Sequence, residues 1–199
     1  MYRKGRGFAV VLLCALALCG CYKKVNIREV IGTDRMKVEP YRATYVIDHN
    51  DCGQITTYAS YVFVATVTDY ERTFYRNNYP DQPVTVYRLR VKENIKGSLR
   101  KDTDVVLEKA GGLRLGTDRF LISEGDILPE PGKTYLFSAV ILDGELYCPM
   151  PNMVIPVENP EDIDGDTDVI TFRELCKDPV PEVPNGNQYK SKYDSGEEQ

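Results

Sequence analysis

The sequence predicts a mainly β protein: a small, closed or partly open Greek-key barrel with one short helix near its end. Three observations support this prediction. Several segments of six to twelve residues are rich in Val, Ile, Tyr, Phe and Thr, which favour strands. Turns that contain glycine, proline or aspartate separate these segments. Helical periodicity is nearly absent from the same region.

The first two predicted strands cover residues 60–70 and 83–97. The segment 60–70 carries apolar side chains on both faces, which is typical of a strand that closes into a barrel. The segment 83–97 alternates from Thr85 onward, and this period of two residues predicts a half-buried strand. Its apolar face carries Tyr87, Leu89 and Val91, and its basic face carries Arg88, Arg90 and Lys92.

Two further strands are predicted at residues 103–112 and 133–142. The first ends at a glycine pair, and the second is entered through Pro131-Gly132, a dipeptide that favours a type II turn. Asp143-Gly144 follows between two apolar runs, and an Asp-Gly pair in that setting is a strong hairpin signal. We therefore expect residues 133–142 to pair with the strand after this turn.

The chain after this hairpin supplies the last strand and the helix. Pro149 and Pro151 lie within residues 145–158 and restrict this segment to a sheet edge or a bulge. Thr171 followed by Glu174 makes a capping box, which predicts a short helix at residues 171–177. Residues 178–199 contain three prolines and almost no large aliphatic side chains. They bury too little apolar surface to become ordered, so we predict a disordered tail.

The beginning of the chain has the layout of a secretory signal peptide. Arg3, Lys4 and Arg6 precede an apolar run of 11 residues from Phe8 to Leu18, and small residues follow. A helix needs roughly 20 apolar residues to cross a bilayer, so this run is too short to span one stably. We expect residues 1–20 to be removed; an N-terminal core helix and an uncleaved anchor are the alternatives.

The segment Leu18-Cys19-Gly20-Cys21 resembles the lipobox of bacterial lipoproteins, with Cys19 where Ala or Ser is more usual. In that family the thiol of the final Cys receives a diacylglyceryl group, and a dedicated peptidase cuts just before it. The resemblance implies that Leu18, Cys19 and Gly20 are recognition residues and that Cys21 is the lipid site. Residues 21–42 would then be a tether, which spans roughly 25 Å as a flexible coil.

The charge balance limits the partners of the remaining chain. The sequence has 25 basic and 30 acidic residues, and residues 1–20 contain three of the basic ones and no acid, which leaves 22 against 30, or −8. An acidic chain is a poor candidate for binding a phosphate backbone, so no nucleic-acid partner is expected. Anionic lipid headgroups would repel it, so we expect it to meet the membrane through the lipid on Cys21.

The strand segments between residues 59 and 147 resemble the OB-fold barrel of netrin-type modules, a group that includes the tissue inhibitors of metalloproteinases. The resemblance lies in strand order and turn positions, and it implies an OB-like barrel over residues 43–177 but no function. In those inhibitors the amine and carbonyl of an N-terminal Cys chelate zinc. Cys21 would carry lipid and lie well before the first strand, so metalloproteinase inhibition is not expected.

No set of residues in the sequence has the spacing of a catalytic site. The single histidine, His49, lies close to Cys52, and a Cys-His pair can supply a nucleophile and a base. Gly53 and the flanking aspartates instead favour a turn with a solvated histidine. We therefore expect no enzymatic activity, no catalytic residues and no cofactor. An enzyme with its site in the barrel loops is the alternative.

The acidic segment 161–168 raises the question of a metal site. It contains four alternating aspartates, Asp162, Asp164, Asp166 and Asp168. An EF-hand calcium loop needs Gly at its sixth position and Glu at its twelfth, and these positions hold Thr167 and Arg173 here. We predict an acidic surface loop and no metal site, with a weak calcium site as the alternative.

Three cysteines, Cys52, Cys148 and Cys176, follow the predicted lipid site. Disulfides form outside the cytoplasm, and three cysteines allow three single pairings. A Cys52–Cys176 bond would join the segment before the first strand to the late helix, and this is the predicted disulfide. Three buried thiols are the alternative.

These patterns together predict a lipid-anchored protein on the extracytoplasmic face of a bacterial membrane, whose barrel binds a protein, peptide or glycan without catalysis. OB barrels usually bind across one sheet face and its flanking loops. The candidate contact surfaces are residues 70–80, which include Tyr70, Phe74, Tyr75 and Tyr79, and the loop around Arg114 and Arg119. Capping of the barrel is the role we expect for these aromatic side chains, so no binding residues are assigned. A structural role in an envelope complex is the alternative to ligand binding.

Overall fold

The computed structural model describes residues 26–77, 79–184 and 190–196, without the side chains of residues 79 and 80. The predicted signal peptide, its recognition residues Leu18, Cys19 and Gly20, and the lipid site Cys21 lie outside these ranges. The elements within them are α2 (Ile27–Val30), β1 (Lys37–Tyr41), α3 (Cys52–Tyr58), β2 (Tyr61–Arg76), β3 (Tyr79–Lys96), β4 (Val105–Ala110), β5 (Gly112–Leu113), β6 (Arg119–Ser123), β7 (Thr134–Leu142), β8 (Glu145–Cys148), β9 (Val154–Pro156), the 3₁₀ turn η1 (Ile163–Gly165) and α4 (Thr167–Leu175).

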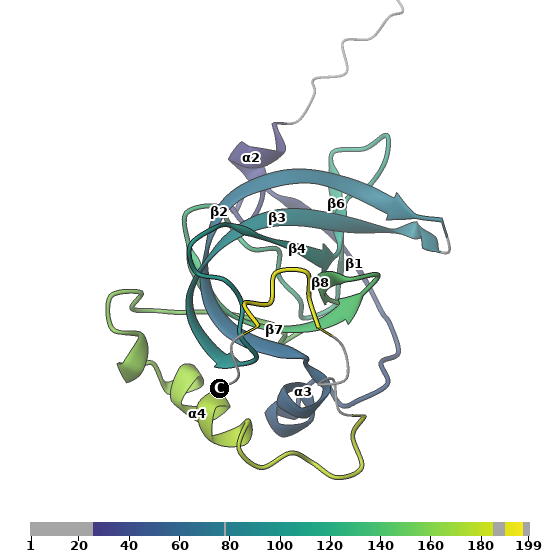
Figure 1. The fold of residues 1–199 in the computed structure, drawn as a ribbon. Coiled ribbons are helices and arrows are strands. Elements are labelled where there is room, and N and C mark those ends of the chain that lie inside the picture. The colour runs from purple at the N-terminus through teal and green to yellow at the C-terminus, as the bar shows by residue number, and fades with distance from the viewer. Residues whose placement is uncertain (1–25, 78, 185–189, 197–199) are drawn as a thin grey trace, which may run out of the picture.

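Strands β2, β3, β4, β8 and β7 follow one another around a small, nearly closed barrel (Figure 1). Neighbours in this order are antiparallel, except for the parallel pair β4 and β8. β2 also pairs with β7, from Tyr61↔Ala139 to Thr66↔Thr134, which closes the ring, and β9 adds to β7. The predicted fold class, a mainly β OB-like barrel with a short C-terminal helix, is confirmed.

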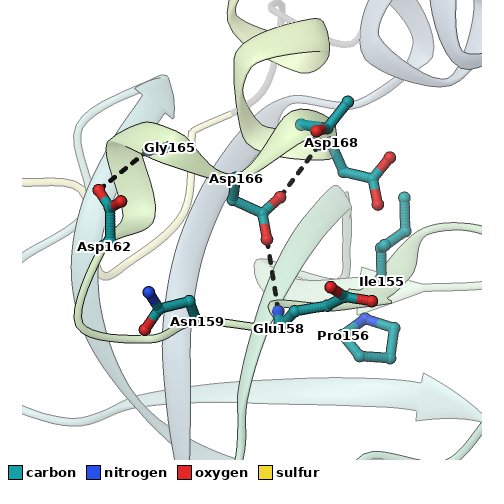
Figure 2. Close-up of a pocket in the computed structure, with 9 residues that line it drawn as sticks. Ile155, Pro156, Glu158, Asn159, Asp162, Gly165, Asp166 and Asp168 are labelled. Carbon is teal, nitrogen blue, oxygen red and sulfur yellow. Dashed lines mark hydrogen bonds between the residues drawn. The ribbon is translucent and has the colours of Figure 1, made fainter.

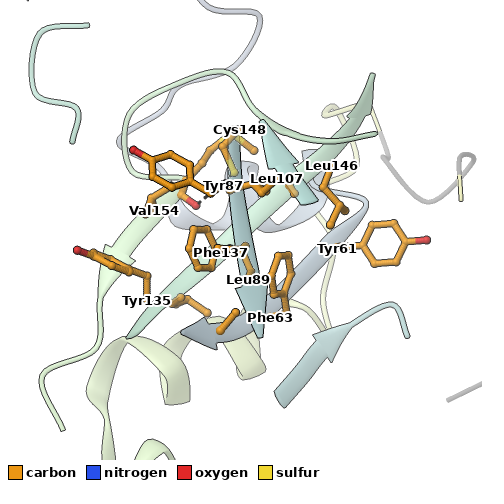
Figure 3. Close-up of a cluster of buried hydrophobic side chains, with 14 of the residues drawn as sticks. Tyr61, Phe63, Tyr87, Leu89, Leu107, Tyr135, Phe137, Leu146, Cys148 and Val154 are labelled. Atoms are coloured by element: carbon orange, nitrogen blue, oxygen red, sulfur yellow. Dashed lines mark hydrogen bonds between the residues drawn. The ribbon is translucent and has the colours of Figure 1, made fainter. Parts of the chain in front are cut away.

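The barrel interior is filled by alternate side chains of its strands, as a small barrel requires. In β3 the alternation read from the sequence is confirmed, with Tyr87, Leu89 and Val91 buried and Arg88, Arg90 and Lys92 exposed. Phe63 of β2 stacks on Phe137 of β7 with ring centroids 5.4 Å apart, and Tyr135 lies 5.9 Å from Phe137 (Figure 3). The Phe63–Phe137 contact joins the two strands that close the ring.

Two of the predicted turns are present in the structure. Asp143 (φ 54°) and Gly144 (φ 82°) form the two-residue hairpin between β7 and β8, closed by the pair Leu142↔Glu145. Positive φ at both central residues is what this type of hairpin needs. Gly132 has a φ of 89° after Pro131, and the Lys133 amide donates to the Glu130 carbonyl at 3.2 Å, as expected for a type II turn.

A second sheet, in the order β1–β6–β5, was not predicted from the sequence. β1 runs parallel to β6, from Lys37↔Arg119 to Tyr41↔Ser123. The predicted tether, residues 21–42, is therefore folded in its described part, because α2 and β1 lie within it. Pairing with a strand about 80 residues away orders this segment, and local periodicity does not report such pairing.

The late helix begins four residues before the predicted start. Asp166 caps it by accepting hydrogen bonds from the amides of Asp168 and Val169 at 3.0 and 3.2 Å. Thr171, the predicted cap, lies inside the helix, where its hydroxyl donates to the Thr167 carbonyl at 2.8 Å. The capping-box prediction was wrong because a stronger cap residue, Asp166, precedes it.

The turn expected around His49 and Gly53 leads directly into helix α3. The Asp51 side chain accepts hydrogen bonds from the amides of Gly53 and Gln54 at 2.9 and 3.2 Å, which caps the helix. α3 packs against α4 below the barrel (Figure 1). The second part of this region, residues 52–58, is thus a short helix that the sequence prediction missed.

The described part of residues 178–199 is not disordered, which corrects the prediction for this segment. Leu99, after β3, forms an isolated antiparallel bridge with Asp194. The amide of Arg100 donates to the Tyr193 carbonyl at 3.0 Å. Hydrogen bonds, together with the partly buried side chains of Val183 and Tyr193, hold this segment against the barrel despite its low aliphatic content.

Candidate functional site

The β2–β3 hairpin continues beyond the barrel as an arm, which we define as residues 70–83 (Figure 1). β2 pairs with β7 only as far as Thr66, and β3 pairs with β4 only from Thr85 onward. The candidate contact surface at residues 70–80 is therefore the far part of two strands rather than a loop. OB barrels commonly bind ligands at the loops after their first and fourth strands, which correspond here to the arm and the β7–β8 turn.

Arg76 joins the arm to the β7–β8 turn. Its guanidinium donates to Asp143 Oδ2 at 3.0 Å and pairs with Glu108 Oε2 on β4. The side chains of Arg76 and Glu108 are 17% and 10% exposed, so water screens their attraction weakly. The guanidinium also lies 5.7 Å from the Phe74 ring centroid and 5.3 Å from that of Tyr147.

The polar network around Arg76 is incomplete. Nε of Arg76 and Oε2 of Glu145 are buried and have no hydrogen-bond partner within the described part of the chain. Burial raises the pKa of Glu108; the Arg76 charge opposes this shift, and the Glu145 charge adds to it. Burial raises the pKa of Tyr147 to about 12.

The arm also borders a hollow of about 300 Å³, lined by Glu39, Tyr75, Asp81, Arg114, Leu115 and Leu121. The Tyr75 hydroxyl donates to the Leu113 carbonyl at 3.1 Å and accepts from the Leu115 amide at 2.7 Å. These two bonds hold the aromatic ring against the turn between β5 and β6. Arg114 pairs with Glu39, and the Leu115 side chain is 83% exposed. The hollow therefore offers aromatic, charged and apolar contacts within a small area.

The structure brings together only some of the residues named from the sequence. Tyr75 and Arg114, from the two predicted surfaces, line the same hollow. Tyr70 is buried, with its hydroxyl 3.1 Å from that of Thr73, so it belongs to the core. The carbonyl of Arg119 accepts from the Arg114 amide at 2.8 Å, which helps to hold the turn. The side chain of Tyr79 lies outside the description.

Sequence reasoning missed several residues of this region. Arg76, Glu108 and Asp143 converge from β2, β4 and the β7–β8 turn, with 32 and 67 residues between Arg76 and its two partners. Glu39 reaches the hollow from β1, a strand that was predicted to be tether. No local pattern connects such distant positions, so only the closure of the barrel places them together.

The acidic segment 161–168 borders a second hollow, of about 500 Å³ (Figure 2). Its carboxylates already bind the backbone, since Asp162 accepts from the Gly165 amide at 3.1 Å and Asp166 from the Glu158 amide at 3.3 Å. Within residues 26–77, 79–184 and 190–196, no group of three or more His, Cys, Asp or Glu side chains is arranged to hold a metal ion. Asp162 and Asp166 therefore act as caps of η1 and α4 in this structure.

His49 and Cys52 have separate environments. The His49 ring lies edge-on to Tyr45 with centroids 5.0 Å apart, and its carbonyl accepts from the Asn152 side chain at 2.9 Å. Burial raises the pKa of the Cys52 thiol, whereas an activated nucleophile has a lowered one.

The three described cysteines are free thiols. The predicted Cys52–Cys176 disulfide is therefore not formed in this structure, although α3 and α4 pack together. Burial raises the pKa of Cys176 to about 11 and that of Cys148 to about 12. Both thiols thus remain protonated at neutral pH and pack as small apolar groups.

Comparison with models of known families and with curated proteins found no match to this chain. In the part of the chain that the structure describes, no helix is long and apolar enough to cross a membrane.

Proposed function

We propose that this chain is a lipid-anchored protein of a bacterial cell envelope, which presents its OB-like barrel as a non-catalytic binding module. The arm and its adjoining hollow would contact an exposed peptide segment of a protein partner. The observation that carries this proposal is the double hydrogen bond of the Tyr75 hydroxyl to the turn at Leu113 and Leu115. These bonds hold the Tyr75 ring beside the exposed Leu115 and the Arg114–Glu39 ion pair before any partner binds. A ring that is already fixed loses less conformational entropy on binding.

The anchoring part of the proposal is supported by the lipobox-like segment Leu18-Cys19-Gly20-Cys21. Lipid on Cys21 also answers a physical difficulty, because the acidic chain that follows would be repelled by anionic headgroups. Each buried CH₂ group contributes about 0.8 kcal/mol, so two or three acyl chains hold a protein stably where one does not.

The non-catalytic part is supported by the state of the candidate nucleophile and base. The raised pKa of Cys52 disfavours the thiolate, and His49 is packed on Tyr45. The mixed character of the hollow suits recognition instead, since aromatic and arginine side chains are enriched in protein interfaces.

The anchor is tested by labelling producing cells with an alkynyl fatty acid and comparing the wild-type chain with Cys21→Ser. We expect label on the wild-type chain only, together with a mature mass that begins at the modified cysteine. An intact first residue with an unmodified thiol at Cys21 would remove the anchor from the proposal.

The contact surface is tested by placing a photo-crosslinking amino acid at Leu115 in intact cells, with Ile170 as the matched control. Ile170 is 45% exposed on α4, which lies on the other side of the barrel from the arm (Figure 1). We expect a discrete protein adduct from position 115 and none from position 170. Equal adducts at both positions, or none at position 115, would contradict a contact surface on the arm.

A further inference from the structure

Residues 190–196, which we call the strap, lie across the barrel (Figure 1, yellow). The strap pairs with the chain just after β3 through the bridge Leu99↔Asp194. The Arg100 amide donates to the Tyr193 carbonyl at 3.0 Å, and the Ser195 amide donates to the Ser98 carbonyl at 2.7 Å. Main-chain pairing of this kind is how an extended peptide adds to an existing strand.

Tyr61, at the start of β2, contacts the strap at two points. Its hydroxyl accepts from the Ser191 amide at 2.8 Å and donates to the Asp194 carboxylate at 2.7 Å. Ser98 Oγ donates to the same carboxylate at 3.3 Å. Burial by itself would raise the pKa of Asp194, but hydrogen bonds led by that of Tyr61 outweigh it and lower the pKa. The barrel surface therefore recognises an ionised aspartate.

Gly97 makes room for this recognition. Its φ is +78°, and a Cβ atom at this position would lie 2.5 Å from Cδ1 of Tyr61. A larger residue at position 97 would displace the Tyr61 ring from the strap. Glycine and tyrosine thus form one unit that shapes the surface beneath the strap.

The neighbours of Asp194 in the strap are also recognised. Lys192 pairs with Glu145 of β8, and its Nζ lies 5.0 Å from the Tyr193 ring centroid. The Tyr193 ring is partly buried against the barrel core. A cation, an aromatic ring and an acid in succession each have a contact, which is a specific pattern for a short segment.

We propose that the surface formed by Tyr61, residues 97–100 and Glu145, which we call the strap groove, is a docking site for an extended peptide of a partner protein. The peptide would carry a cationic, an aromatic and an acidic residue in succession. The strap of this chain occupies the groove when no partner is bound. The strap is held by a few hydrogen bonds, one ion pair and one partly buried ring, and the β2–β7 pairing that closes the barrel does not include it. A tethered occupant competes at an effective concentration in the millimolar range, so it suppresses weak partners.

The test uses the full chain with the strap weakened by the double substitution Tyr193→Ala and Asp194→Ala. The probe is a synthetic peptide with the sequence of residues 190–196, and the readout is the shift of the Ser98 and Arg100 amide signals in NMR titrations. We expect the peptide to bind this variant at least tenfold more tightly than the wild type, in which the strap competes. Addition of Tyr61→Phe should weaken that binding about tenfold, because both hydrogen bonds of the hydroxyl are lost.

A peptide with alanine in place of its aspartate is the matched control and should bind about tenfold more weakly. Equal binding of both peptides, or equal binding to the variant and the wild type, would overturn the proposal. If the double variant fails to fold, hydrogen exchange in the wild-type chain decides. The Ser195 and Arg100 amides should exchange at least tenfold faster than the paired amides of β2 and β3. Exchange of all of them at one rate, through global unfolding, would show that the strap does not open.

Discussion

Replacing Asp126 by alanine should leave the Lys109 ammonium group without its charge partner inside the barrel. The Lys109 side chain, on β4, is 0% exposed, and that of Asp126, in the loop between β6 and β7, is 1% exposed. Lys109 Nζ pairs with Asp126 Oδ2 and donates to the Ala110 carbonyl at 3.4 Å. Asp126 Oδ1 accepts from the Ile127 amide at 2.8 Å. The carboxylate thus joins the loop to the inside of the barrel.

The expected magnitude follows from desolvation. Removing one partner of a buried ion pair costs about 3–5 kcal/mol, because the remaining charge stays out of water. We expect Asp126→Ala to lower the free energy of unfolding by about 4 kcal/mol. At about 2–4 °C per kcal/mol for a chain of this size, the melting temperature should fall by about 8–16 °C. The double variant Lys109→Met, Asp126→Leu removes both charges and keeps apolar volume, so it should recover most of this loss.

The assay is urea unfolding followed by tyrosine fluorescence, since the chain has 14 tyrosines and no tryptophan. Asp118→Ala is the matched control, because Asp118 pairs with Lys37 where the two side chains are 49% and 64% exposed. That exposed pair should contribute less than about 1 kcal/mol. If Asp126→Ala destabilises no more than Asp118→Ala, or if the double variant is as unstable as Asp126→Ala, then Lys109 and Asp126 do not form a buried ion pair that stabilises the barrel.

Three further predictions concern other parts of the fold. The Tyr87 hydroxyl is buried without a hydrogen-bond partner among the described residues. Tyr87→Phe should therefore leave the free energy of unfolding unchanged or raise it by about 1 kcal/mol in the same urea assay, and a clear decrease would contradict this. Asp166→Ala removes the cap of α4 and should cost about 1 kcal/mol, whereas Asp168→Ala in the first turn of the same helix should cost less; equal losses would argue against the cap. Burial raises the pKa of Tyr61 and Tyr147 to about 12, so folding favours the neutral phenols. Their contribution to the free energy of unfolding is complete below the unfolded pKa of about 10 and is lost as the pH rises from about 10 to 12. The urea midpoint of unfolding should therefore fall across that pH range. A midpoint that stays constant from about pH 10 to 12 would contradict the raised pKa values.

The strands that alternate or carry strong turn signals were predictable from the sequence. Residues 83–97 alternate because one face of β3 is buried and the other solvated, and Asp143-Gly144 adopts the positive φ angles that its residue types permit. The elements that were missed depend on distant partners. β1 becomes a strand only by pairing with β6, and α3 is short enough that its packing on α4 decides its stability.

The candidate site divides in the same way. The aromatic and basic residues of the arm and of the β5–β6 turn were visible as two separate segments, and Tyr75 and Arg114 do line one hollow. The sequence did not indicate that Glu39 and Asp81 would line the same hollow. It also did not indicate that Arg76 would contact both Glu108 and Asp143. The opposite error occurred at the strap, where low aliphatic content suggested disorder although the hydrogen bonds of Tyr61 hold it.

The sequence by itself determined the strand-rich barrel, two of its turns, its acidic character and the lipobox-like segment from which the anchor is proposed. All of these are local properties, because backbone preferences, side-chain alternation and charge act over a few neighbouring residues. Only the tertiary structure decided which strands close the ring, where Lys109 meets Asp126, and which residues line the arm and hold the strap. The reason is that burial and ion pairing depend on distance in space, and barrel closure brings together groups that the chain separates by tens of residues.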